Sequence, residues 1–165
     1  MTPLTLLAPE KVVGLLTNNA SLQMAVNAIA ANSGQILPPI LTSQIVATAI
    51  SPELADKNAQ MTYPRVCIYC TQIKNSHTQK FRSFSGSIAI VIEVWFSSNL
   101  VETTGAGLHY FVEAVTSILR ANQGDWGDGF YFSGLYDVQL QVPKPGGFGF
   151  VESARVICSL DVNVN

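Results

Sequence analysis

The stretch GSIAIVIEVWF, residues 86–96, decides the fold of this chain. Large apolar side chains recur at every second position, which is the period of side chains along one face of a β-strand. The residues between them are mostly apolar too, and Glu93 is the one charge in the run. A strand that is apolar on both sides needs a cover on both faces. The pattern therefore predicts a central strand of a sheet.

Three other segments alternate with the same period. They are RVCIYCTQI (65–73), GFYFSGLYDVQLQV (129–142) and FVESARVICSLDVNVN (150–165). In the second of these, Phe132, Tyr136, Val138, Leu140 and Val142 are expected to point inward. The first segment is joined to the central strand by KNSHTQKFRS (74–83), which is too long for a tight turn and too polar for burial. We expect two antiparallel strand pairs, with a protruding loop in the first pair.

Two helical patterns accompany these strands. Apolar residues follow i, i+3, i+4, i+7 spacing between the two strand pairs, at Leu108, Phe111, Val112, Val115, Ile118 and Leu119. A second pattern runs from Pro9-Glu10 to Ser33-Gly34, with a break expected at Asn18-Asn19. Pro38-Pro39 then stops a helix and leaves an extended segment. A strand is expected at 45–50, followed by a helical turn that Ser51 caps and Pro52 begins.

The expected fold class is α+β, with helices packed on a mostly four-stranded antiparallel sheet. The expected order is helix, strand pair, helix, strand pair, in one domain of residues 1–165. Residues 1–60 form its N-terminal helix and extended segment, and residues 61–165 form the sheet with its core helix. The helix at 108–119 covers one face of the sheet. The N-terminal helix or a neighbouring subunit covers the other.

The composition points to a surface that another protein covers. Only 12% of the 165 residues are charged, against about 25% in an average soluble domain. A charge-poor surface is typical of a subunit whose surface is partly buried in an assembly. The net charge of −2 provides no basic field, so we expect no direct nucleic-acid binding. No apolar run approaches the roughly 20 residues of a membrane-spanning helix, and the start shows no signal-peptide pattern, so synthesis in a cytoplasm is expected.

The sequence VCIYC (66–70) contains a C-x-x-C pair, yet its context is a strand. Side chains three apart in a strand point to opposite faces, so Cys67 and Cys70 cannot share one metal. A redox pair begins a helix, and a zinc knuckle needs a second pair of ligands on a turn. We therefore predict free thiols at Cys67, Cys70 and Cys158.

Other sequences that resemble reactive motifs lack the context those motifs need. GAGLHY (105–110) has Tyr110 where a dinucleotide loop needs glycine. GDWGDG (124–129) brings Asp125 near Asp128 but lacks the ligand series of a calcium loop. FSGS (84–87) is not a nucleophile elbow, and His77 and His109 are expected on the surface. We therefore expect no catalytic residue, no cofactor and no metal site.

The loop between the first two strands is the candidate interaction site. It contains Lys74, His77, Lys80 and Arg82, and its three basic residues are a third of the nine Lys and Arg in the chain. A loop held between two strands can be presented to a partner, where charge steers association. The alternative is a solvated loop whose charge serves only solubility.

The sequences TYPRVCIYC (62–70) and KFRSFSGSIAIVIEVWFSS (80–98), followed by one amphipathic helix and a closing strand pair, resemble the tail terminator or tail completion proteins of long-tailed bacteriophages. The resemblance runs from about Ile45 to the C-terminus. It implies a virion structural protein, not an enzyme, that forms a hexameric ring at the head-proximal end of the tail tube and joins tail to head. The implied partners are other copies of the chain, the tail tube protein and head-tail connector proteins.

The chain departs from this family pattern in two places. One is the N-terminal segment with Pro38-Pro39, and the other is the turn PKPGGFGF (143–150). These departures leave open a neighbouring connector, or another tail protein such as a tube or baseplate component. A small-molecule-binding domain or enzyme is the alternative of a different class. Self-assembly into a large symmetric particle separates the structural roles from that alternative.

Overall fold

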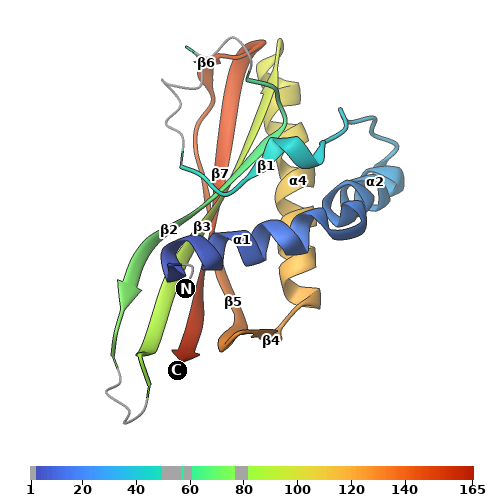
Figure 1. Cartoon of the computed structure of the whole chain (residues 1–165). Helices are drawn as coiled ribbons and strands as arrows, with labels where there is room; N and C mark the ends of the chain where they lie inside the picture. The colour runs from blue at the N-terminus through green and yellow to red at the C-terminus, as the bar shows by residue number, and fades with distance from the viewer. Residues whose placement is uncertain (1–2, 50–56, 58–60, 77–81) are drawn as a thin grey trace.

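The structure is a computed structural model of the chain, and it describes residues 3–49, 57, 61–76 and 82–165. Its elements in chain order are α1 (Leu4–Thr17), the 3-10 turn η1 (Asn18–Ala20), α2 (Ser21–Ser33), the 3-10 turn η2 (Thr42–Gln44), β1 (Ile45–Val46), β2 (Arg65–Lys74), β3 (Phe84–Ser98), α4 (Val101–Ala121), β4 (Gly124–Gly127), β5 (Phe130–Leu140), β6 (Lys144–Gly146) and β7 (Gly149–Val164). The long strands run side by side, and α4 runs along them while α1 crosses them (Figure 1).

The strands form one seven-stranded sheet. Its order is β1-β2-β3-β7-β5-β4, and β6 also pairs with β7. The central strand is β3, as its sequence predicts, and it pairs with β7 over its whole length from Phe84 to Ser98. The β1–β2 pair is parallel, and the other pairs are antiparallel. The sheet is therefore mixed.

This sheet corrects the expected fold class. A mostly four-stranded antiparallel α+β sheet in the order helix, strand pair, helix, strand pair is wrong, because the chain is a mixed α/β fold with seven strands. The sequence pattern misses β4 and β6 because strands of four and three residues are too short to show alternation, and it predicts β1 as a strand at 45–50 without its parallel pairing to β2. Moreover, β4 and β6 lie in glycine-rich sequences that are typical of turns.

The N-terminal helical segment begins earlier than its pattern predicts, at Leu4 rather than Pro9. The predicted break at Asn18-Asn19 is confirmed, because the backbone there passes through the left-handed region, with φ of 52° at Asn19 and 54° at Ala20. This change of direction separates α1 from α2. The two helices can therefore present separate apolar stripes to one core.

The segment after α2 is less regular than expected. The strand predicted at 45–50 comprises only Ile45 and Val46. The helical turn predicted to begin at Ser51-Pro52 lies outside the described residues. β1 is short, but its parallel pairing with Val66 and Cys67 gives the sheet its mixed character.

The helix predicted around residues 108–119 is confirmed, and it extends over the whole of α4. Its apolar stripe packs on β3 and β7. Phe111 is fully buried, and its ring lies 5.7 Å from the ring of Phe96, centroid to centroid. Gly107 allows this close approach, because a Cβ at that position would overlap the Phe96 ring. The helix is therefore fixed along the length of the sheet.

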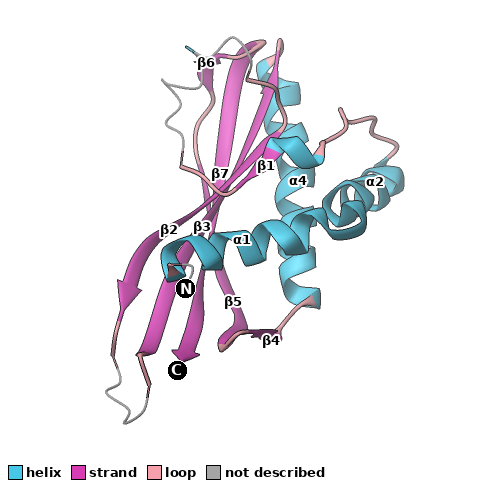
Figure 2. Ribbon diagram, viewed as in Figure 1, coloured by secondary structure: helices cyan, strands magenta, loops and turns pink. Residues whose placement is uncertain are grey.

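The helices α1 and α4 lie on the same face of the sheet, which we call the helix face (Figure 2). It carries Ile88, Ile90, Ile92, Val94 and Phe96 of β3, which share one core with α1, α2 and α4. Of the two expected covers of the opposite face, the N-terminal helix is therefore wrong, and a neighbouring subunit stays a prediction. The apolar stripe of α1 joins the core that α4 already covers. We call the opposite face, which carries Val91, Glu93 and Trp95, the outer face.

Candidate protein-interaction site

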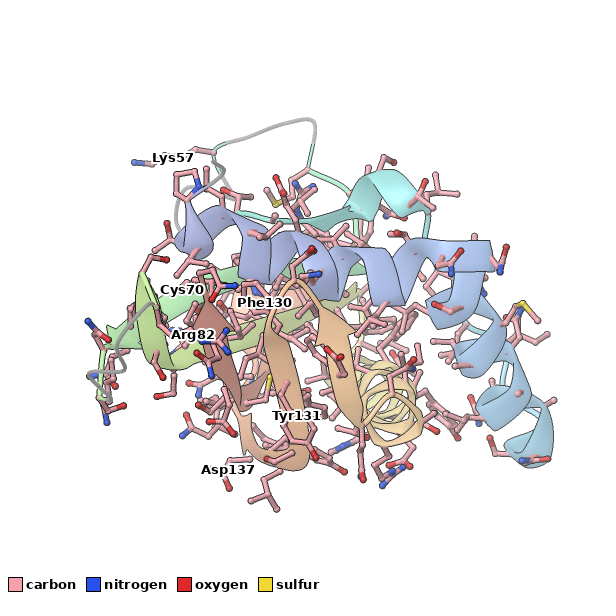
Figure 3. The ribbon with its side chains drawn as sticks, turned by 60° about the horizontal axis from the view of Figure 1, so that its bottom comes forward. Lys57, Cys70, Arg82, Phe130, Tyr131 and Asp137 are labelled. Atoms are coloured by element: carbon pink, nitrogen blue, oxygen red, sulfur yellow. The ribbon has the colours of Figure 1, made fainter. Side chains whose placement is uncertain are left out.

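The predicted interaction loop is described only at its two ends. Lys74 ends β2 and Arg82 precedes β3, and both are exposed. His77 and Lys80 lie outside the described residues. Figure 3 labels Arg82 together with Cys70 of β2, and Figure 1 places the end of this hairpin at one tip of the sheet. The structure therefore places two of the four predicted residues at a common exposed end.

The base of this loop is tightly packed. Asn75 Oδ1 accepts a hydrogen bond of 3.4 Å from the Ser85 backbone N–H. A Cβ at position 86 would overlap the backbone carbonyl of Lys74, so Gly86 permits the close approach of the two strands. Both contacts hold the ends of the hairpin in place, which supports presentation of the loop from a rigid scaffold.

The outer face contains a buried carboxylate. The Glu93 side chain in β3 is about 4% exposed, and it accepts hydrogen bonds from the Tyr69 hydroxyl at 3.0 Å and from Arg155 Nε at 3.2 Å. The three residues come from β2, β3 and β7. Arg155 pairs with Glu93 across the sheet register and supplies its counter-charge. This cluster ties the three central strands together on the outer face.

Tyr69 shows the effect of that cluster. Burial and, next, the negative charge of Glu93 and its hydrogen bond raise the pKa of Tyr69 from 10.0 to about 12. The phenol therefore stays protonated and remains a donor to Glu93 at neutral pH. The Glu93 carboxylate therefore has two hydrogen-bond donors, Tyr69 and Arg155.

A hollow of about 370 Å³ lies on the outer face beside this cluster. Glu93, Trp95 and Arg155 line its floor from the sheet, and Lys144 and Pro145 of β6 belong to its wall. The Trp95 indole N–H is buried and has no hydrogen-bond partner among the described residues. The hollow therefore presents Arg155, which is already paired with Glu93, in a lining that also includes Gln141 and Ser153.

The cysteines are free, as predicted, and Cys67 and Cys70 lie on opposite faces. Cys67 pairs with Glu93 in the sheet and is buried on the outer face, whereas Cys70 pairs with Ile90 on the helix face and is partly exposed. Burial raises the pKa of all three thiols, to about 12 for Cys158. The described residues hold no group of three or more metal-ligating side chains.

The other motif-like sequences have structural roles. Asp128 forms an ion pair of 2.9 Å with Lys11 of α1, and the lysine hydrogen bond lowers the pKa of its carboxyl. Asp125 accepts a hydrogen bond from the Gly127 backbone N–H. GAGLHY lies inside α4 rather than in a strand-to-helix loop, and His109 is exposed there, as predicted.

The two lateral edges of the sheet are only partly paired within the described ranges. β4 pairs with the Phe130–Phe132 end of β5, and no described strand lies beside Tyr136–Leu140 on that side. At the opposite edge, β1 pairs with Val66 and Cys67, and no described strand lies beyond Ile68–Lys74. We call these segments the β5 edge (Tyr136–Leu140) and the β2 edge (Ile68–Lys74).

The β5 edge exposes apolar side chains on the helix face. Val138 is 40% and Leu140 is 53% exposed, although Val156 and Ala154, their partners in β7, are fully buried. The helix α4 packs mainly on β3 and β7, and it contacts the beginning of the β5 edge through the hydrogen bond that Arg120 donates to the Tyr136 hydroxyl. An unpaired strand that exposes apolar side chains is a surface on which another strand can pair.

The sequence pattern places these residues on the correct face but does not predict their exposure. Phe132 is buried as expected, whereas Val138, Leu140 and Val142 are exposed. Alternation shows which side of a strand a residue occupies, but it does not show where the covering helix ends. The one sequence signal for this edge is the low charge of β5, in which Asp137 is the only charged residue.

No family model matches the chain, and no curated protein matches it either. None of the helices in the described ranges combines the length and apolar character that crossing a membrane requires. Function is therefore inferred from the residues and their geometry.

Proposed function

We propose that this chain is a virion structural protein, a tail terminator or tail completion subunit of a long-tailed bacteriophage. Copies of the chain form a ring, hexameric by the family resemblance, at the head-proximal end of the tail tube. The observation that carries the proposal is the pair of open sheet edges, of which the β5 edge exposes Val138 and Leu140. Exposed apolar strand edges on a single subunit fit a protein that works as part of an assembly.

The composition supports the same role. A surface with few charges packs against other copies without the desolvation cost of ions. The buried cluster of Tyr69, Glu93 and Arg155 stiffens the central strands, which suits a subunit that transmits contact between tail and head. The role is mechanical rather than catalytic.

The partners of the ring are the tail tube protein and the head-tail connector proteins. Lys74 and Arg82, with His77 and Lys80 between them in the sequence, form the loop that docks the ring on one of these partners. Lys74 ends β2 and Arg82 precedes β3, and both side chains are exposed. Charged residues at the rim of a contact mainly steer association and set partner choice.

Localisation on the particle tests the terminator role. Phage particles that carry this chain are labelled with gold-conjugated antibody against it and imaged by electron microscopy. Label at the junction of head and tail supports the proposal. Label along the tail or at its distal end identifies a tube or baseplate protein instead, and particles without label contradict a virion role.

A small-molecule-binding domain is the second candidate, and the hollow on the outer face favours it. Arg155 lines that hollow and its side chain is 42% exposed, so it suits a ligand with a carboxylate. Titration of small carboxylates against tryptophan fluorescence tests this function, with Arg155→Met as the control. A saturable change that Arg155→Met abolishes supports a ligand site, and its absence removes this candidate.

A further inference from the structure

We propose that the β5 edge of one copy pairs with the β2 edge of the next copy, so that the sheets of neighbouring subunits become continuous. The inference rests on the self-assembly proposed above, and it identifies the contact that produces it. The occupant of the β5 edge is therefore a second copy of this chain.

Strand direction favours this contact. β2, β3, β7 and β5 are each antiparallel to the next, so β2 and β5 run in opposite directions at the two edges. When a second copy is placed beside the first with its strands running in the same directions, its β2 edge lies antiparallel to the β5 edge of the first copy. Antiparallel pairing gives well-aligned hydrogen bonds. A contact between two different edges is head-to-tail, and repeated head-to-tail contacts close into rings.

The two edges also lie at the same level of the sheet. Tyr136 pairs with Cys158, Cys158 with Ile90, and Ile90 with Cys70. In the same way, Val138 is level with Ile68 through Val156 and Ile92. Without a shift the two edges overlap over Tyr136–Val138 and Ile68–Cys70, whereas Leu140 is level with Val66, which β1 already pairs. A shift of two residues along the strands places Leu140 opposite Ile68 and Val138 opposite Cys70, and it keeps each side chain on its own face.

The side chains at the two edges are complementary. Pairing places Val138 and Leu140 beside the helix face of the neighbouring β2, on which α1 packs, and so removes apolar surface from water. Asp137, the only charged residue of β5, is level with Tyr69 through Ile157 and Val91, so no charged residue of β2 opposes it. Figure 3 shows Asp137 on the side of the sheet remote from α1.

The symmetric alternative, in which two β5 edges pair with each other, closes after two copies and leaves both β2 edges open. Antiparallel pairing of Tyr136–Leu140 with itself sets Asp137 opposite Gln139, so charge does not decide between the two contacts. The β2 edge is the better partner because only the head-to-tail contact continues beyond two copies.

Cross-linking through the native Cys70 tests the contact. Cys70 lies on the helix face of the β2 edge and is partly exposed, whereas Cys67 and Cys158 are buried. Cysteine is introduced on the helix face of the β5 edge in three single variants, Tyr136→Cys, Val138→Cys and Leu140→Cys. The assembled protein is oxidised, and electrophoresis without reductant separates the products. Directly opposed strand residues meet the distance requirement of a disulfide.

Two controls make the result specific. Asp137→Cys and Gln139→Cys place the new thiol on the outer face, where it points away from Cys70. Cys70→Ser, added to each helix-face variant, removes the native partner. We expect dimers and higher multiples from at least one helix-face variant, little product from the outer-face variants, and loss of the product with Cys70→Ser.

The outcomes separate this contact from the proposed function. If the protein assembles but the helix-face variants cross-link no more than the outer-face variants, the edge contact is wrong and the ring proposal stands. A product that survives Cys70→Ser joins two β5 edges and also overturns the contact. If the Cys70-dependent ladder forms but the assemblies are open chains rather than rings, the contact stands and the ring function fails. A protein that stays monomeric and uncross-linked overturns both.

Discussion

Phe111 is the residue whose truncation tests the packing of α4 most simply. Its ring is fully buried against Phe96, so Phe111→Ala removes both apolar burial and an aromatic contact. We expect the free energy of unfolding to fall by about 3–5 kcal/mol, as for other buried phenylalanines. Urea unfolding measures it. His109→Ala on the exposed side of α4 is the control, with a change within about 0.5 kcal/mol; a Phe111→Ala cost as small as that would place Phe111 on a surface.

Arg155 neutralises a carboxylate that water barely reaches. Arg155→Met leaves Glu93 with Tyr69 as its donor, so we expect a loss of about 1–3 kcal/mol in unfolding free energy. Adding Glu93→Gln removes the buried charge and should recover part of that loss. Arg120→Met is the matched control, because its ion pair with Glu113 is about half exposed and solvent screens it, so we expect a much smaller loss. Equal costs for the two arginines would contradict a buried role for Glu93.

Tyr69 predicts how stability depends on alkaline pH. Its folded pKa of about 12 lies above the ordinary 10.0, so the folded state holds this proton more tightly than the unfolded state. Its contribution is complete below pH 10 and is lost as the pH rises through about 12. Urea unfolding of the wild type and of Tyr69→Phe across that range should show a difference that shrinks with rising pH. A difference independent of pH would contradict the shifted pKa.

The residues of the outer face show what sequence alone can predict. Alternation places Cys67 and Cys70 on opposite faces, because that property is local to one strand. The environment of Glu93 is not local, since Tyr69 and Arg155 are brought to it by strand pairing over 24 and 62 positions of the chain. The sequence therefore shows that Glu93 interrupts an apolar strand, but it does not predict which groups form hydrogen bonds with its carboxylate.

At the scale of elements, the same distinction separates long strands from short ones. β2, β3, β5 and β7 are predicted from their period, whereas β1, β4 and β6 exist because a longer strand offers an edge to pair with. Their parallel or antiparallel direction depends on that neighbour and not on their own residues. The wrong prediction of a mostly four-stranded antiparallel sheet arises from these short strands, whose pairing the sequence does not show. The extent of α4 over the sheet is likewise a tertiary property, and it decides which residues of β5 are exposed.

The loop between β2 and β3 gives a prediction about attachment. Replacing Lys74, Lys80 and Arg82 together by serine should leave folding and self-assembly intact, because Lys74 and Arg82 are exposed. We expect weaker attachment of the ring to tail or head, with a deficit relative to the wild type that is largest at low salt and shrinks as the salt concentration rises, because salt screens the charges that steer association. The yield of infectious particles measures it.

Lys57→Ser with Lys144→Ser provides the control for that variant, since both lysines are exposed and lie outside the loop. Normal yield from the loop variant would reduce the loop to a solvated surface. A loop variant that fails to fold would mean that these basic residues are structural.

At the scale of the whole molecule, the open edges, the exposed apolar side chains and the low charge are the features from which we propose a subunit of an assembly. Apolar side chains of the helix face are exposed at both edges of the described sheet, at Ile73 of β2 and at Val138 and Leu140 of β5. Sequence composition predicts that some surface is covered. The structure indicates these two edges as the place of the proposed contact.

Self-assembly of the purified chain is the central claim, and light scattering coupled to size-exclusion chromatography, with negative-stain images of the same peak, tests it most directly. The account predicts one species of about six times the 17.8 kDa chain mass, seen as a closed ring with a central opening. Val138→Lys, which puts a charge on the β5 edge, should shift that species toward monomer. A wild-type protein that elutes as a monomer or dimer at all accessible concentrations, without rings in the images, would contradict the account.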